Sequence, residues 1–426
     1  MSRLGRLQAS RVLHGSAWIL IGLGIQSVLG FTFWLLGSRV ATSSQLGQAS
    51  ALFTAISFVN YASGMGLTIA LARHATDASA ESDALFGWGI AATVLSSIVA
   101  GCAYLAVTDT SATRLVTGSP AGWAVFCAFT AGTSVGLLVD VRLMAARRWG
   151  WLVGRIALVG LVRLPLVGLD VSMDPALWLY GLMLAPLAIT GVLAVPVLGR
   201  IGAGGVRWHR PASLRAVARY SGVNWVATLA SQAPQFVLPL VVAQSVASSD
   251  NANFFLAWTI TGLVFLVPAA ISQVLLVEGS KEADDPAAAA EEAHKAKEAM
   301  RFSVGLAVVA WAASLVIGRV AAAIFGDDYD ELARLLPSLM LAGIPWAYTS
   351  VRLSQARIRR DQVATVAITA TLGLGILVPA LLLVPTHGTL AASRSWVFGN
   401  LAGAVAAAVT APRARRSRAG GPTPTA

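Results

Sequence analysis

The sequence consists largely of long apolar runs of about 20 residues, separated by short polar stretches. Of the 426 residues, 56% are hydrophobic and 12% are charged, whereas about a quarter of the residues of a typical soluble domain are charged. Backbone amides in lipid must find hydrogen-bond partners within their own segment or within a closed barrel, so long apolar runs form helices there. The sequence therefore predicts an all-α integral membrane protein.

About twelve apolar runs are long enough to span a bilayer, and they fall into two sets of six. The first set lies near residues 14–37, 48–71, 84–107, 122–144, 152–169 and 177–198. The second set lies near residues 220–244, 254–277, 302–325, 334–356, 363–384 and 389–411.

Basic residues are distributed unevenly between alternate loops. If the N-terminus is cytoplasmic, 25 of the 31 Lys and Arg lie in or beside the inner loops and tails. Cytoplasmic loops carry such an excess in membrane proteins, so we expect a multi-pass protein of the cell membrane with both termini cytoplasmic. The basic stretches lack the interleaved aromatic residues of a nucleic-acid interface, and no nucleic-acid partner is predicted.

The basic, glycine-rich segment between the two sets of runs reads as a linker. We therefore expect five parts: a cytoplasmic N-terminus at 1–13, a six-helix lobe at 14–198, a cytoplasmic linker at 199–219, a second six-helix lobe at 220–411, and a disordered basic tail at 412–426.

A weak internal repeat supports two equivalent halves. At an offset of 206 residues, the run from Val40 to Ser43 aligns with the run from Val246 to Ser249, and Gln26 aligns with Gln232. Both halves start on the same side of the membrane, so the repeat is predicted to be parallel, as in several transporter folds.

No nucleotide loop, zinc spacing or nucleophile elbow is present, so we predict neither an enzyme nor a cofactor or metal site. The candidates for function are polar residues inside the spans, because polar groups are costly there. The charged candidates are Asp140, Arg163 and Arg319, and the uncharged ones are Gln26, Asn60, Asn224, Gln232, Gln235, Gln273 and Asn400.

Each candidate has a structural explanation beside the functional one. For Asp140, snorkelling or a local ion pair is favoured over a role in ion coupling. Arg163 and Arg319 could bind an anion, since guanidinium matches phosphate oxygens, or could snorkel to the outer interface. The amides could line a cavity or could hold helices together by hydrogen bonds.

Three stretches of the sequence resemble a known family. They are YSGVNWVATLASQAPQFVLPLVV with the run that follows it, from Tyr220 to Ser280; LGQASALFTAISFVNYASGMGLTIALAR, ending at Arg73; and IFGDDYDELARLLPSLMLAGIPWA, from Ile324. They are similar to the polysaccharide and lipid-linked oligosaccharide flippases of the multidrug/oligosaccharidyl-lipid/polysaccharide exporter superfamily, of the actinobacterial lipopolysaccharide biosynthesis protein type.

This resemblance implies two six-helix lobes that form a V around a central cavity and work by alternating access. The cargo would be a lipid-linked oligosaccharide or related cell-envelope precursor, and glycosyltransferases or a polymerase of the same pathway could be partners. Carried onto this sequence, the cavity residues become Gln26, Asn60, Asn224, Gln232, Gln235 and Gln273, with Arg39 and Arg73 near the two mouths.

Two other functions remain open. An ion-coupled drug or secondary-metabolite exporter of the same superfamily usually needs a buried carboxylate in a cavity-lining span. The first, second, seventh and eighth spans contain none before Glu278. A membrane glycosyltransferase or polymerase would need acidic residues beside a sizeable outer loop, and the outer loops here are short.

Overall fold

The computed structural model describes residues 3–64, 66–74, 79–169, 171–279, 286–359 and 361–411. Over these ranges the chain forms helices and no strand. The predicted tail at 412–426 lies outside the described residues.

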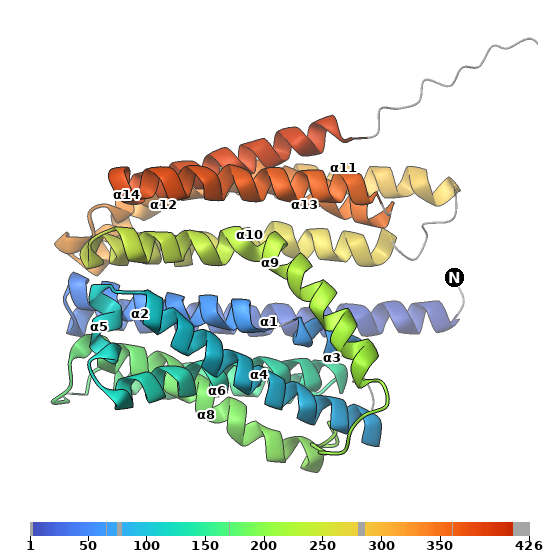
Figure 1. Ribbon diagram of the computed structural model, residues 1–426. Helices are drawn as coiled ribbons and strands as arrows, with labels where there is room; N and C mark the ends of the chain where they lie inside the picture. Colours follow the sequence, from blue (N-terminus) through green and yellow to red (C-terminus); the bar gives the residue numbers. More distant parts are fainter. Residues whose placement is uncertain are drawn as a thin grey trace, which may run out of the picture.

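The helices form two bundles that lie side by side with their axes roughly parallel (Figure 1). The first bundle, the N lobe, contains α1 (Arg3–Val40), α2 (Ser43–Ser63), α3 (Leu67–His74), α4 (Ala80–Val107), α5 (Ser111–Thr117), α6 (Pro120–Ala145), α7 (Trp149–Leu166) and α8 (Pro175–Arg200). The second, the C lobe, contains α9 (Leu214–Ser245), α10 (Ser248–Gly279), α11 (Pro286–Phe325), η1 (Asp327–Tyr329), α12 (Leu332–Leu341), α13 (Gly343–Ile358) and α14 (Gln362–Val409).

These helices account for about twelve passes along the bundle, as the apolar runs predict. The pairs α2 and α3, and α12 and α13, each make one interrupted pass. Helix α14 makes two passes, because its backbone turns at Gly388, where φ is 66° and ψ is −155°. Among the described residues, seven helices are individually long and apolar enough to cross a membrane. The predicted all-α membrane fold with two lobes is confirmed.

The helix ends follow from local sequence. Thr42 caps α2 in a reciprocal pair with Gln45, while Ser119 and Asp174 accept hydrogen bonds from backbone amides at the starts of α6 and α8. Pro120 and Pro175 occupy the first positions of the latter two helices, where no hydrogen bond from the proline nitrogen is required.

Two boundaries differ from the sequence expectation. Helix α1 begins at Arg3, well before residue 14, and α9 begins at Leu214, so the last residues of the predicted linker are helical. We call the end of the molecule that carries the connection between α8 and α9 the linker end, at the right of Figure 1, and the opposite end the far end.

The hydrophobic core is arranged differently at the two ends. At the far end one continuous cluster joins the lobes and includes Trp34, Leu52, Phe254 and Leu332. At the linker end the N lobe has its own cluster, and smaller clusters around Val351 and Leu353 lie within the C lobe. Among the described side chains, α10–α14 therefore share a core with the N lobe at the far end only, whereas the start of α9 adds Val217 to the linker-end cluster of the N lobe.

Candidate functional site

The far end is closed by close packing of α2 against α10. A Cβ atom added at Gly47 would lie 1.6 Å from the backbone oxygen of Ser248, so the two helices touch through their backbones. The side-chain amide of Asn251, which is 3% exposed, donates to the Gly47 carbonyl at 2.9 Å and to the Ser50 hydroxyl at 3.2 Å. A glycine at this position is what permits the contact.

A second polar contact at the far end joins the lobes through α5. The hydroxyl groups of Ser111 and Ser248 lie 2.9 Å apart. The loop before α5 is held by Arg114, whose guanidinium donates to both carboxylate oxygens of Asp109 at 2.7 and 2.8 Å. These hydrogen bonds keep the pKa of the exposed Asp109 carboxyl below its usual range.

Aromatic rings fill the space beneath these polar contacts. Trp34 of α1 and Phe53 of α2 meet Phe255 of α10 edge to face, with centroid distances of 4.9 and 6.0 Å. Phe31 of α1 meets Phe325 of α11 at 5.8 Å. Edge-to-face pairs add to the free energy of apolar burial, so the closure is both polar and hydrophobic.

Helix α9 is divided between the lobes. Its far-end half packs against α14, whereas towards the linker end it crosses to the N lobe (Figure 1). Tyr61 of α2 stacks on Phe236 at 4.7 Å and donates its hydroxyl to the Leu229 carbonyl, and the Trp225 indole donates to the Ala62 carbonyl at 2.8 Å. From Trp225 to Phe236, α9 thus contacts the N lobe along α2.

The break between α2 and α3 allows α9 to approach closely. Gly66 has φ 65°, in the left-handed region that favours glycine, and a Cβ added there would lie 2.3 Å from the Ser221 carbonyl oxygen. Farther along, Val217 of α9 is buried in the linker-end core of the N lobe.

The connection between α8 and α9 is fixed to the N lobe by two carboxylates at the start of α4. Asp83 pairs with the buried Arg142 at 2.6 Å and accepts from the Gly205 amide at 2.8 Å. Glu81 accepts from the Ser213 amide at 2.9 Å and from the Ser213 hydroxyl at 2.6 Å, just before α9 begins.

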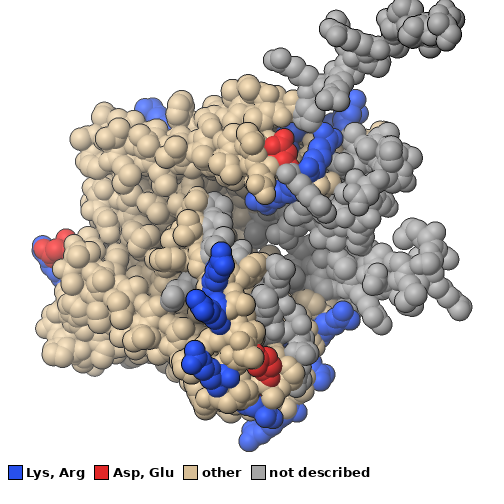
Figure 2. Space-filling view, turned by 45° about the vertical axis from the view of Figure 1, so that its right-hand side comes forward, with Lys and Arg blue, Asp and Glu red and all other residues tan. Residues whose placement is uncertain are grey.

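The surface between the lobes is hollowed towards the linker end. Figure 2 shows this hollow on the face turned to the viewer, and Lys and Arg side chains gather around that end of the molecule. Helices α1, α2, α9 and α10 lie at the contact between the lobes. We take the region between the lobes, on the linker side of the far-end closure, as the candidate site.

The six amides predicted to line the cavity fall into three groups. Gln26, Gln232 and Gln235 are exposed on α1 and α9. Asn60 is half-buried within the N lobe, where its amide donates to Thr133 at 2.9 Å and its carbonyl accepts from Ser134 at 2.8 Å. It joins α2 to α6 by hydrogen bonds. The side chains of Asn224 and Gln273 lie outside the described residues.

Of the two arginines expected near the mouths, Arg39 is exposed at the far end and donates to the Ile324 carbonyl, so it joins α1 to α11 across the lobes. The Arg73 side chain lies outside the described residues.

The remaining amide candidate, Asn400, is fully buried in α14 and donates to the Trp396 carbonyl at 2.8 Å.

The charged candidates lie apart from one another. Asp140 forms an ion pair with Arg155 of α7 inside the N lobe. Arg163 is 3% exposed, lies over the Phe33 ring at 5.0 Å and contacts the Met183 sulfur at 2.7 Å. Within the described part of the chain it has no carboxylate partner. Arg319 is exposed on α11.

Sequence reasoning missed Glu81, Asp83, Asn251 and Gly47. The two acids lie in a polar connection that looks solvated, and only their pairing with Arg142 and the Ser213 backbone reveals their role. A signal existed for the far-end contact: Gly47 and Asn251 lie just after the two repeated segments. Over the described residues, no group of three His, Cys, Asp or Glu side chains could hold a metal ion.

No family model matches the sequence, and no curated protein matches it significantly. Among solved structures, the fold is similar to the inward-facing conformation of a multidrug resistance MATE family transporter of the MOP superfamily. The TM-score is 0.63 and the identity 15%, over 92% of this chain and 96% of that one.

A MOP superfamily transporter from Pyrococcus furiosus, described as having a binding pocket of reverse polarity that suggests a different function, gives a TM-score of 0.62. The identity is 13%, over 93% of both chains. The outward-facing conformation of a multidrug resistance MATE family transporter gives 0.60 at 12% identity, over 93% of this chain and 94% of that one. These similarities establish the fold, which is that of the MATE transporters.

Proposed function

We propose that this protein is an exporter that works by alternating access between its two lobes. The observation that carries the proposal is the core that the N lobe shares with α10–α14 at the far end, set against separate clusters at the linker end, where only the start of α9 joins the N-lobe cluster. Two bundles joined in this way can rock about their contact, which is how repeat-built transporters expose a central site to either side. The fold shared with MATE transporters supports the same function.

The linker end is proposed to face the cytoplasm. Arg200, Arg207 and Arg210 lie in or beside the connection between the lobes, and Arg357 and Arg359 lie at the end of α13. Positive residues in short loops favour the cytoplasmic side. The structure would then be an inward-open state of the transport cycle, closed towards the outside by the contact of α2 with α10.

The proposed cargo is a lipid-linked oligosaccharide or a related polysaccharide precursor. Support comes from the resemblance of the segment from Tyr220 to Ser280 and from the exposed amides Gln26, Gln232 and Gln235. Amide side chains both donate and accept hydrogen bonds, so they match the hydroxyl groups of a glycan.

A drug or secondary-metabolite exporter of the same fold is the alternative. Coupling to protons or sodium would require a carboxylate that can change its state in the cavity. Asp140 lies inside the N lobe and is already paired with Arg155, and α1, α2, α3 and α9 contain no acidic residue. The acids of α10, Asp250 and Glu278, lie near its two ends. These observations favour the lipid-linked cargo.

Deleting the gene tests the cargo. We expect undecaprenyl-linked intermediates to accumulate on the inner leaflet, and a plasmid copy should restore normal levels. Unchanged lipid-linked pools would contradict the proposed cargo. If toxic compounds or a metabolite accumulated instead, the alternative exporter would be the better description.

A further inference from the structure

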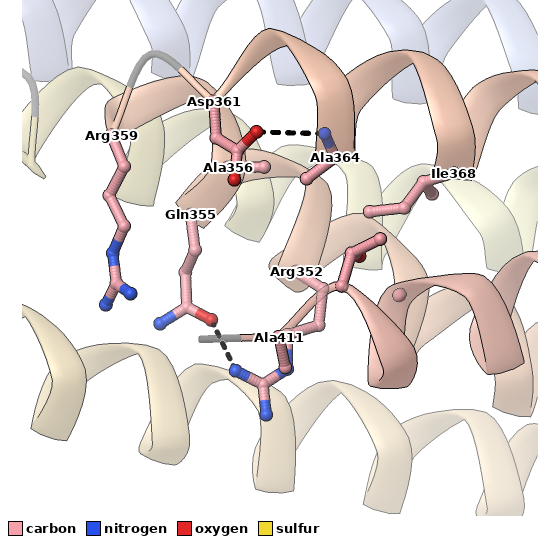
Figure 3. A pocket seen from close by; sticks show the side chains of 10 residues that line it. Arg352, Gln355, Ala356, Arg359, Asp361, Ala364, Ile368 and Ala411 are labelled. Atoms are coloured by element: carbon pink, nitrogen blue, oxygen red, sulfur yellow. Dashed lines mark hydrogen bonds between the residues drawn. The ribbon is translucent and has the colours of Figure 1, made fainter. Parts of the chain in front are cut away.

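A separate hollow lies at the linker end of the C lobe, away from the interface between the lobes. It is open to solvent and lies between the last turns of α13, the first turns of α14 and the last turn of α14. Its polar lining comes from Arg352, Gln355, Arg359, Asp361 and Thr410 (Figure 3). The hollow thus lies at helix ends.

One arginine of this hollow is held in a fixed orientation. Arg352 donates to the Gln355 side-chain oxygen at 3.1 Å, and its guanidinium lies over the Tyr348 ring, 5.5 Å from the centroid. Gln355 is 8% exposed. In Figure 3, Arg352 and Arg359 lie on opposite sides of Gln355. The two cationic groups therefore border the same space.

Among the described residues that line the hollow, positive groups outnumber carboxylates. Asp361 is the only carboxylate in the lining, and it caps α14 by accepting from the Ala364 amide at 2.9 Å. Within the described residues, neither Arg352 nor Arg359 forms an ion pair. By contrast, Arg142 and Arg155 of the N lobe are both paired with aspartates.

We propose that this hollow binds a phosphate-bearing anion. Guanidinium groups present parallel N–H donors that match phosphate oxygens, and they keep their charge at every physiological pH. The phosphate could belong to an anionic lipid headgroup at the membrane surface or to a soluble phosphate compound. The site is distinct from the proposed transport cavity and does not depend on the cargo.

The test uses the purified full-length protein in phosphatidylcholine nanodiscs. One arm adds phosphatidylglycerol and counts retained molecules by native mass spectrometry. The other titrates inorganic phosphate and follows thermal stabilisation. We expect Arg352→Gln and Arg359→Gln each to weaken binding about tenfold, because a hydrogen bond to a charged group is lost. Arg352→Lys should retain part of the affinity.

Arg200→Gln is the matched control, since it removes one exposed positive charge from the linker end of the N lobe. It should leave binding within twofold of the unchanged protein. Binding of the lipid alone, or of phosphate alone, would identify the source of the anion and support the site. Binding of neither, or an equal loss in the control, would overturn the proposal. Arg359 is exposed, so its substitution should not impair folding.

Discussion

At the scale of single residues, the buried charges act mainly in structure. Asp140 and Arg142 are two residues apart on α6, and side chains at that spacing do not face each other. Each instead pairs with a charge on another helix: Asp140 with Arg155 of α7, and Arg142 with Asp83 of α4. The sequence shows that these charges lie near the end of an apolar span, but their burial and their partners depend on helix packing.

Replacing Asp83 by Asn should strongly destabilise the protein. Arg142 is 2% exposed and would keep its charge after losing the counter-charge of Asp83, at a cost of about 3 kcal/mol. The measurement is the midpoint of heat-induced loss of the monodisperse peak in size-exclusion chromatography. Asp109→Asn is the control, because it removes the same group from an exposed pair with Arg114 and should change little. Equal midpoints for the two variants would contradict the structural role of Asp83.

For the amides, the sequence predicts which polar residues lie inside spans but does not predict what they bind. Asn60 can be recognised in the sequence as a polar residue inside a span, and both a cavity and a helix contact fit that pattern. Only the positions of Thr133 and Ser134 on α6 show that its side chain is used between helices. For Gln26 and Gln232, which are exposed, the role in transport stays a prediction.

At the scale of elements, the two segments of the repeat predicted from sequence both lie at the junction between the first and second helices of a lobe. The segment from Val40 to Ser43 joins α1 to α2, and the segment from Val246 to Ser249 joins α9 to α10. The contact between α2 and α10 follows directly after these junctions. The repeat indicates where the contact lies, but the closeness of the two backbones was not predictable, because a single glycine carries no sign of what approaches it.

Gly47→Ala should prevent full closure of the far end. The added methyl would overlap the Ser248 backbone, which cannot move aside as a flexible side chain could. We expect the distance between spin labels at Ala121→Cys and His387→Cys to increase by several ångströms, in a background lacking Cys102 and Cys127. Gly24→Ala is the control, since no atom lies within 4 Å of its added Cβ. Identical distance distributions in the two variants would argue against backbone contact as the closure.

At the scale of the whole molecule, the apolar runs were sufficient to predict about twelve helices in two lobes. They could not predict that the linker-end half of α9 packs on the N lobe. That arrangement depends on the conformation of Gly66, on the Trp225 hydrogen bond to Ala62 and on Glu81, and none of these changes the hydrophobic pattern. By its place in the chain α9 belongs to the C lobe, but by its contacts the start of α9 belongs to the N lobe.

The division of α9 bears on how the lobes would move. Its far-end half packs against α14 and its linker-end half packs on the N lobe, and Pro234 and Pro239 lie between Leu229, which accepts from Tyr61 of α2, and the end of the helix. Proline removes a backbone hydrogen bond and allows a helix to bend. We expect α9 to bend near these prolines when the far end opens.

The most direct test of alternating access is a disulfide across the far end. Ser111→Cys with Ser248→Cys places two thiols where the hydroxyl groups lie 2.9 Å apart, in a background without Cys102 and Cys127. In the deletion strain, the doubly substituted protein should complement when reduced, lose complementation when oxidised, and recover on addition of a reductant. Each single cysteine should complement throughout. Full complementation by protein shown to be cross-linked would contradict the account.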